Sequence, residues 1–99
     1  VPFYEAAARL ALADLVVNCT SRAAASAVAG LPWRRLPGSS LVFDLNYGSA
    51  ARPVLDSVRG AERRAVDGLE MLAWQGIAAF ERWTGRQAPL HEVLPALGD

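Results

Sequence analysis

The sequence predicts an α/β fold in which a parallel sheet of about three strands is flanked by helices. Residues 14–19 and 41–45 are strand candidates whose apolar residues, 15–17 and 41–43, are consecutive rather than alternating, which is typical of parallel strands covered on both faces. A third, very short strand is expected at 64–66. Helical patterns separate and follow these segments, and such alternation favours a parallel sheet with right-handed crossovers.

One helix is expected before the first strand and another between the second and the third. The alanine-rich segment 2–12 has apolar residues at helical spacing, and Pro53 opens a short helix that ends near Arg59. Residues 22–40 mix Ala, Gly, Pro and Ser, so we expect a long loop with at most a short turn of helix.

The best-defined helix follows the third strand. Asp67 and Glu70 have the spacing of a capping box, and Gly85 is a typical C-terminal stop. A final helix is expected over 89–97, shortened or kinked by Pro95. The apolar stripe of the long helix is Leu69, Leu72, Ala73, Gly76, Ile77 and Phe80.

The composition excludes several classes of protein. The 99 residues suffice for one small domain, and ten Arg balance ten acidic residues, which argues against nucleic-acid binding. A hydrophobic content of 53% argues against disorder, and no apolar run approaches the roughly 18–20 residues that span a bilayer. The chain has no Lys, one His and one Cys, so we expect no metal site and no Cys–His nucleophile.

The start of the chain and its single cysteine bear on where the protein acts. No signal peptide is visible, and the missing initiator Met indicates a piece of a longer chain. Cys19 has no partner for an internal disulfide, so we expect a buried small side chain and a protein of the reducing cytoplasm. His91 and the arginine pairs 34–35 and 63–64 are expected at the solvated surface.

Polar residues and glycine gather where the three strands end. In parallel sheets, ligands bind beyond the carboxyl ends of the strands, which makes 18–21, 44–47 and 67–68 the candidate site. Asp44 and Asp67 resemble an acid–base pair. We favour structural roles for both, Asp44 by accepting hydrogen bonds from backbone amides and Asp67 by capping a helix.

These strand ends resemble motifs of the shikimate dehydrogenase family. Residues 13–21, ADLVVNCTS, resemble its "DLVVNATS", and residues 42–47, followed by Arg52-Pro53, resemble "VFDMVYNP…TP". Residues 66–76 resemble "DGLGMLVxQA", with Glu70 in place of the second Gly, and 79–85 resemble "AFxxWTG". The motifs occur in the family's order, and the resemblance covers about 13–97.

The resemblance implies that the chain, 1–99, is a single partial domain. Residues 13–68 would be the C-terminal half of an NAD(P)-binding, Rossmann-like domain with a parallel sheet, and 69–97 would be closing helices. The family reversibly reduces 3-dehydroshikimate to shikimate with NADP, on the route to chorismate and the aromatic amino acids. The implied cofactor is therefore NADP.

The resemblance also implies roles for individual residues. Tyr47 and Gln75 would contact the substrate, because a phenol and a primary amide supply the donors and acceptors that a hydroxylated ring acid needs. From the residues alone, Tyr47 also fits a half-buried packing role and Gln75 a solvated helix face. The cofactor-side residues would be Leu45, Gly68, Asn18 and Thr20.

The family's catalytic Lys–Asp pair and glycine-rich phosphate loop lie in the preceding part of its members. This chain has no Lys and no G-x-G-x-x-G, so we assign it no catalytic residue and expect a missing N-terminal catalytic domain as its partner. Two other functions stay open. One is a non-catalytic α/β module that keeps the fold and needs a partner chain. The other is a stand-alone binder of a small ligand, which the missing phosphate loop disfavours.

Overall fold

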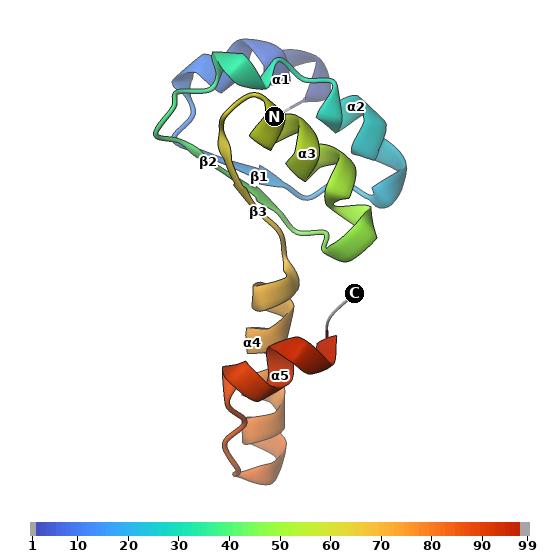
Figure 1. Cartoon of the computed structure of the whole chain (residues 1–99), viewed down its shortest axis with the longest axis vertical. Helices are drawn as coiled ribbons and strands as arrows, with labels where there is room; N and C mark the ends of the chain where they lie inside the picture. Colours follow the sequence, from blue (N-terminus) through green and yellow to red (C-terminus); the bar gives the residue numbers. More distant parts are fainter. Residues whose placement is uncertain (1, 98–99) are drawn as a thin grey trace.

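The computed structural model describes residues 2–97 and contains a three-stranded, wholly parallel sheet (Figure 1). The strands β1 (Leu15–Asn18), β2 (Leu41–Asp44) and β3 (Arg64–Val66) lie in the order β1-β2-β3. In the register, Asn18 lies opposite Asp44 and Phe43 lies opposite Val66. The predicted fold class and the third strand at 64–66 are confirmed.

Helices and short 3₁₀ turns connect the strands. The predicted helix at 2–12 is α1 (Phe3–Arg9) followed by a 3₁₀ turn, η1 (Leu10–Leu12). Pro53 lies in the first turn of α3 (Arg52–Gly60), as expected of a residue without an N–H. The remaining short elements before β3 are η2 (Arg22–Ala24), α2 (Ala25–Ala29), η3 (Trp33–Arg35) and η4 (Gly48–Ala50).

The segment 22–40 is more structured than predicted. It contains α2 and two 3₁₀ turns, and it buries Val28, Trp33 and Leu36, which are at most 4% exposed. A five-residue helix is marginal on its own propensity, so contacts with distant residues hold it in place. Sequence periodicity misses such an element because those contacts are not local.

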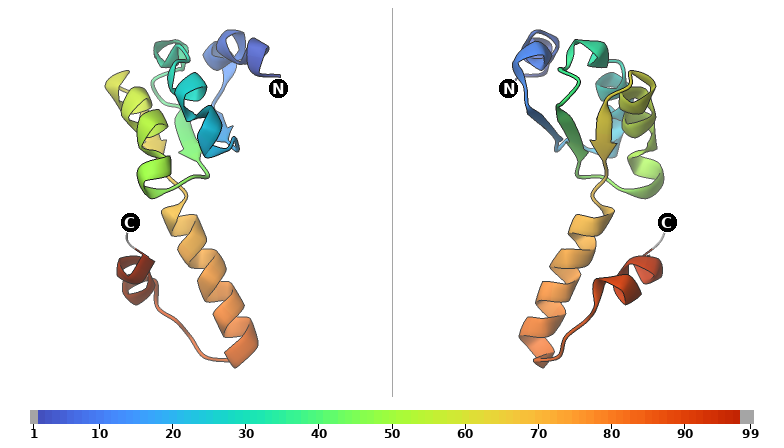
Figure 2. Two further views of the ribbon diagram at one scale, coloured as in Figure 1. Left: turned by 90° about the vertical axis from the view of Figure 1, so that its right-hand side faces the viewer. Right: turned by 60° about the vertical axis from the view of Figure 1, so that its left-hand side comes forward.

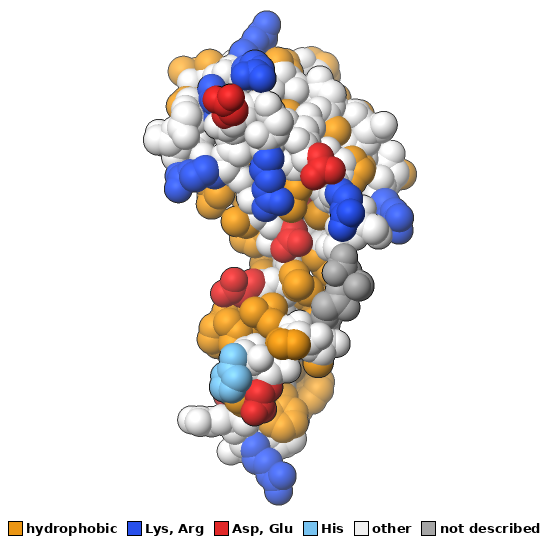
Figure 3. Space-filling view, in the orientation of Figure 1, with side chains coloured by type: hydrophobic (Ala, Val, Ile, Leu, Met, Phe, Trp, Pro, Cys, Tyr) orange, Lys and Arg blue, Asp and Glu red, His pale blue; other side chains and the backbone are white. Residues whose placement is uncertain are grey.

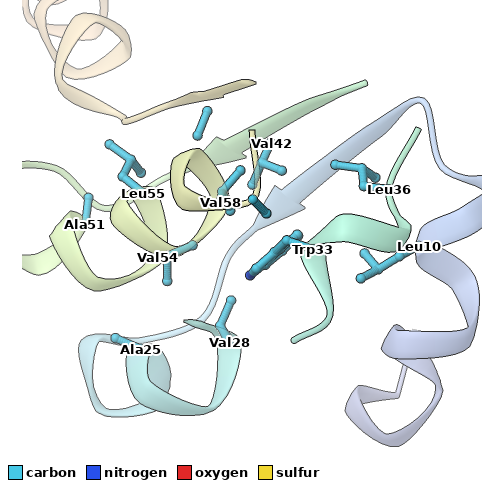
Figure 4. Packing of buried hydrophobic residues seen from close by; sticks show 12 residues of the cluster. Leu10, Ala25, Val28, Trp33, Leu36, Val42, Ala51, Val54, Leu55 and Val58 are labelled. Atoms are coloured by element: carbon cyan, nitrogen blue, oxygen red, sulfur yellow. The ribbon is translucent and has the colours of Figure 1, made fainter. Parts of the chain in front are cut away.

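One face of the sheet carries the hydrophobic core. Val42 of β2 and Ala65 of β3 point into it, and α3 covers them with Val54 and Val58 (Figure 4). Trp33 packs into the same cluster, and α2 lies against α3. Burying each of the valine side chains contributes about 1.5–3 kcal/mol, which makes this face the main source of stability.

The other face of the sheet is uncovered over the part of the chain that the structure describes. Leu15, Val17 and Val66 alternate with the core residues and are 55%, 46% and 44% exposed. The prediction that the strands are covered on both faces is therefore wrong for this chain, because its hydrophobic cluster forms on one face only.

Arg63 anchors the turn that precedes β3. Its guanidinium donates hydrogen bonds to the carbonyl oxygens of Leu36 (2.6 Å), Arg34 (2.9 Å) and Ala61 (3.2 Å). The expectation that Arg63 lies free at the solvated surface is therefore wrong. Its planar fork of donors links η3 to the end of α3.

The long helix α4 (Leu69–Thr84) projects from the end of β3, away from the α/β body (Figures 1 and 2). It gives the molecule an elongated shape of 47 × 24 × 23 Å. Gly85 ends α4 in the left-handed conformation (φ 70°), as predicted. The predicted capping box is wrong: Gly68 is the N-cap, and Asp67 accepts only the N–H of Leu69, at 3.1 Å.

The last helix, α5 (Leu90–Leu97), packs against α4 and includes Pro95. The buried residues of α4 are Ala73 and Ile77, whereas Trp74 and Trp83 are 53% and 82% exposed. Both tryptophans therefore lie largely in solvent within residues 2–97, and apolar side chains are exposed over the α4–α5 projection (Figure 3). None of the described helices combines the length and apolarity needed to cross a bilayer.

Candidate functional site

The candidate site is the edge of the sheet where all three strands end. Asn18 ends β1 and Asp44 ends β2, and the two residues are neighbours across the strand pair. Both side chains lie on the core face and are almost fully buried, at 5% and 0% exposure. The loops that follow them, together with the start of α4, form this edge.

The first loop is organised by Asn18. Its Oδ1 accepts hydrogen bonds from the backbone N–H of Thr20 (3.1 Å) and from the Thr20 hydroxyl (2.6 Å). Cys19 between them is exposed, so the expectation of a buried cysteine is wrong. Successive residues of an extended chain point to opposite sides, and Asn18 already takes the inward position.

The second loop is organised by Asp44. Its Oδ1 accepts hydrogen bonds from the backbone N–H and the side-chain amide of Asn46, both at 2.9 Å. This is an Asx turn, in which a carboxylate binds the backbone two residues ahead. The predicted structural role of Asp44 is confirmed.

Asn46, which sequence reasoning missed, joins all three strand ends. Its side-chain Nδ2 also donates to the carbonyl oxygen of Thr20 (3.2 Å), in the loop after β1. Its own carbonyl accepts a 2.8 Å hydrogen bond from the N–H of Gly68, after β3. An Asn two residues after a strand-end Asp was the available signal, since this spacing is typical of an Asx turn.

Gly68 packs directly against the backbone of Leu45. A Cβ at Gly68 would overlap the carbonyl oxygen of Leu45 and lie 2.9 Å from its carbonyl carbon. Only glycine therefore allows the start of α4 to approach the loop after β2 so closely. The Leu45 side chain is 36% exposed at this edge.

Four of the predicted site residues are brought together by these contacts: Asn18, Thr20, Leu45 and Gly68. Tyr47 directly follows Asn46 and is 43% exposed. Gln75 is exposed on α4, two turns beyond Gly68 and about 10 Å further along the helix axis. The structure therefore places the phenol at the edge itself and the carboxamide on the projecting helix.

Two hollows border the site. One, of about 340 Å³, runs along the open edge of β1 between α1 and η3, and Asn18, Thr20 and Trp33 line part of it. The other, of about 320 Å³, lies between α3 and the start of α4, and Arg52 and Asp67 are among the residues that line it. Neither hollow is lined by Tyr47 or Gln75. Over residues 2–97, no three His, Cys, Asp or Glu side chains converge as metal ligands would.

Comparison with known proteins points to one family. A family profile described as "Shikimate 5'-dehydrogenase C-terminal domain" matches residues 68–97. The chain is 40% identical over 84 residues to the shikimate dehydrogenase (NADP(+)) of Haloarcula marismortui, covering 85% of this chain and 32% of that protein. It is 37% identical over 94 residues to the enzyme of the same name from Streptococcus pneumoniae, covering 94% of this chain and 33% of that protein.

A solved structure agrees with these relatives. The shikimate dehydrogenase of Aquifex aeolicus superimposes with a TM-score of 0.69 at 26% identity, covering 91% of this chain and 33% of that one. Over nearly its whole length the chain is similar to shikimate dehydrogenases. It spans about a third of the length of the curated relatives that it matches.

Proposed function

We propose that this chain is the C-terminal part of an NADP-dependent shikimate dehydrogenase-like oxidoreductase, which interconverts 3-dehydroshikimate and shikimate on the route to chorismate. The observation that carries this proposal is the match over 94% of the chain to an enzyme named for that activity. The chain would supply walls of the substrate and nicotinamide sites, and the preceding part would supply the catalytic groups.

On the substrate side we assign Tyr47 and Gln75. The exposure of both side chains leaves the phenol and the carboxamide free to bind a ligand. A phenol donates and accepts a hydrogen bond, and a carboxamide does both at separate atoms, which suits the hydroxyls and carboxylate of a ring acid. Their role is to orient the ring relative to the cofactor.

On the cofactor side we assign Leu45, Gly68, Asn18 and Thr20. The half-exposed Leu45 offers an apolar surface for the flat nicotinamide ring, and Gly68 keeps the backbone beside it free of a side chain. NADP, when bound, carries the hydride that is exchanged with the substrate carbon. Leu45 would exclude water from that transfer, while Asn18 and Thr20 hold the neighbouring loop in place.

The uncovered surfaces of the sheet support the need for a preceding part. Leu15 and Val17 of β1 are about half exposed, and within residues 2–97 β1 pairs with a strand on one side only. An open parallel edge beside an apolar hollow is the place where a further strand and its helix would pack. We therefore assign 13–68 to the C-terminal half of a Rossmann-like NADP-binding domain and 69–97 to closing helices.

The experiment is a reconstitution. The part of the S. pneumoniae enzyme that precedes the matched third is fused to this chain, or expressed with it as a separate polypeptide. Formation of NADPH from NADP⁺ and shikimate is then followed by absorbance. We expect turnover from the reconstituted enzyme and none from either part alone.

A folded reconstituted protein that shows neither turnover nor shikimate binding contradicts the proposal. That result would favour the alternative, a non-catalytic α/β module that binds a partner chain through its exposed apolar surfaces. Circular dichroism and cooperative thermal unfolding establish that the reconstituted protein is folded.

A further inference from the structure

We propose that Asn46 is a positioning residue, which holds the loop carrying Leu45 and Tyr47 in the geometry needed to bind substrate. This inference rests on the proposed function for its effect on the ligand. The hydrogen bonds that carry it are independent of that function.

The geometry singles out the side-chain amide. One Nδ2 group donates both to Asp44 Oδ1 (2.9 Å), at the end of β2, and to the carbonyl of Thr20 (3.2 Å), beyond β1. The backbone carbonyl of the same residue accepts the N–H of Gly68 (2.8 Å), beyond β3. Asn46 thus ties three segments that are far apart in the sequence.

The carboxylate of Asp44 fixes the position of Asn46. It is fully buried at the end of a strand, and its Oδ1 binds both nitrogens of Asn46. Tyr47 is the next residue along the chain, so the backbone direction at Asn46 sets where the phenol emerges. In the family segment that residues 42–47 resemble, Val stands at this position. The amide link is therefore a feature of this chain and not of the quoted motif.

The first test uses the chain itself and needs no enzymatic activity. In Asn46→Ala, we expect the N–H of Gly68 and the N–H of Leu45, which donates to Asn18, to exchange with deuterium about ten-fold faster. Asn46→Val is the second variant, because it removes the amide and keeps a side chain of similar size. Ser49→Ala, at an exposed position in the adjoining turn η4, is the matched control and should change nothing. Unchanged exchange in both Asn46 variants overturns the proposal.

The second test is a double-mutant cycle in the reconstituted enzyme. If Asn46 acts through Tyr47, Asn46→Ala raises the KM for shikimate about ten-fold in the presence of Tyr47, and less than about three-fold in the Tyr47→Phe background. Equal effects in the two backgrounds overturn the positioning role. Faster exchange in the chain together with an inactive, folded parent enzyme would instead mean that the proposed function has failed.

Discussion

The carbonyl oxygen of Asn46 accepts a 2.8 Å hydrogen bond from the backbone N–H of Gly68. This bond fastens the start of α4 to the loop after β2, next to the place where Gly68 meets the backbone of Leu45. The projecting helix therefore leaves the sheet at a defined point, and the position of Gln75 depends on it.

Gly68→Ala should destabilise the chain by about 2 kcal/mol, since its methyl group would overlap the Leu45 backbone, which has little freedom to move. For a chain of this size, the melting temperature falls by roughly 8–16 °C, measured by circular dichroism. Gly76→Ala, in the exposed interior of α4 with open space around it, is the matched control. It should raise stability by about 0.5–1 kcal/mol through helix propensity. Equal melting temperatures for the two variants would contradict the close contact at Gly68.

Arg63→Ala should cost about 2 kcal/mol of unfolding free energy, because several carbonyl groups of η3 and the end of α3 lose their donor. Arg63→Lys should recover less than half of the loss, since a single ammonium cannot replace a planar fork of donors. Urea denaturation measures both. Arg82→Ala, an exposed arginine on α4, should stay within about 0.5 kcal/mol of the parent, and a similar loss there would refute the anchoring role of Arg63.

Val17→Asp tests the uncovered face of the sheet. Val17 is 46% exposed in this chain, so the change should alter the chain's own stability by no more than about 1 kcal/mol. Binding to the preceding part of the S. pneumoniae enzyme should weaken at least about ten-fold, because the carboxylate would be buried without a partner. Titration calorimetry gives the affinity. Leu12→Asp, at a position 86% exposed in η1, is the control, and equal losses for both variants would rule out a specific interface at β1.

The sheet could be predicted from the sequence because its signal is local. Consecutive apolar residues indicated β1 and β2, and a three-residue run indicated β3 at its observed bounds. The helix after Gly68 was equally visible from its apolar spacing and from Gly85. The short helix α2 was not, since Val28 is buried by partners distant in the sequence.

The candidate site could be predicted only in outline. Parallel topology places the three strand ends at one edge, which brought Asn18, Thr20 and Gly68 together as expected. The roles of Asn46 and Arg63 depend on carbonyl groups as many as 29 residues away, and no sequence pattern marks a carbonyl as an acceptor. Cys19 was wrongly predicted to be buried. Asn18 takes the inward position, so the next side chain along the strand points outward whatever its hydrophobicity.

Tyr47 and Gln75 are proposed to hold the same bound ring, and the KM for shikimate in the reconstituted enzyme tests this claim most directly. Tyr47→Phe and Gln75→Ala should each raise that KM about ten-fold, the effect of losing one hydrogen bond worth roughly 1.4 kcal/mol. The controls Tyr4→Phe and Gln87→Ala, at exposed positions outside the site, should leave it unchanged. An active enzyme whose KM for shikimate is unaffected by either site variant would contradict the claim.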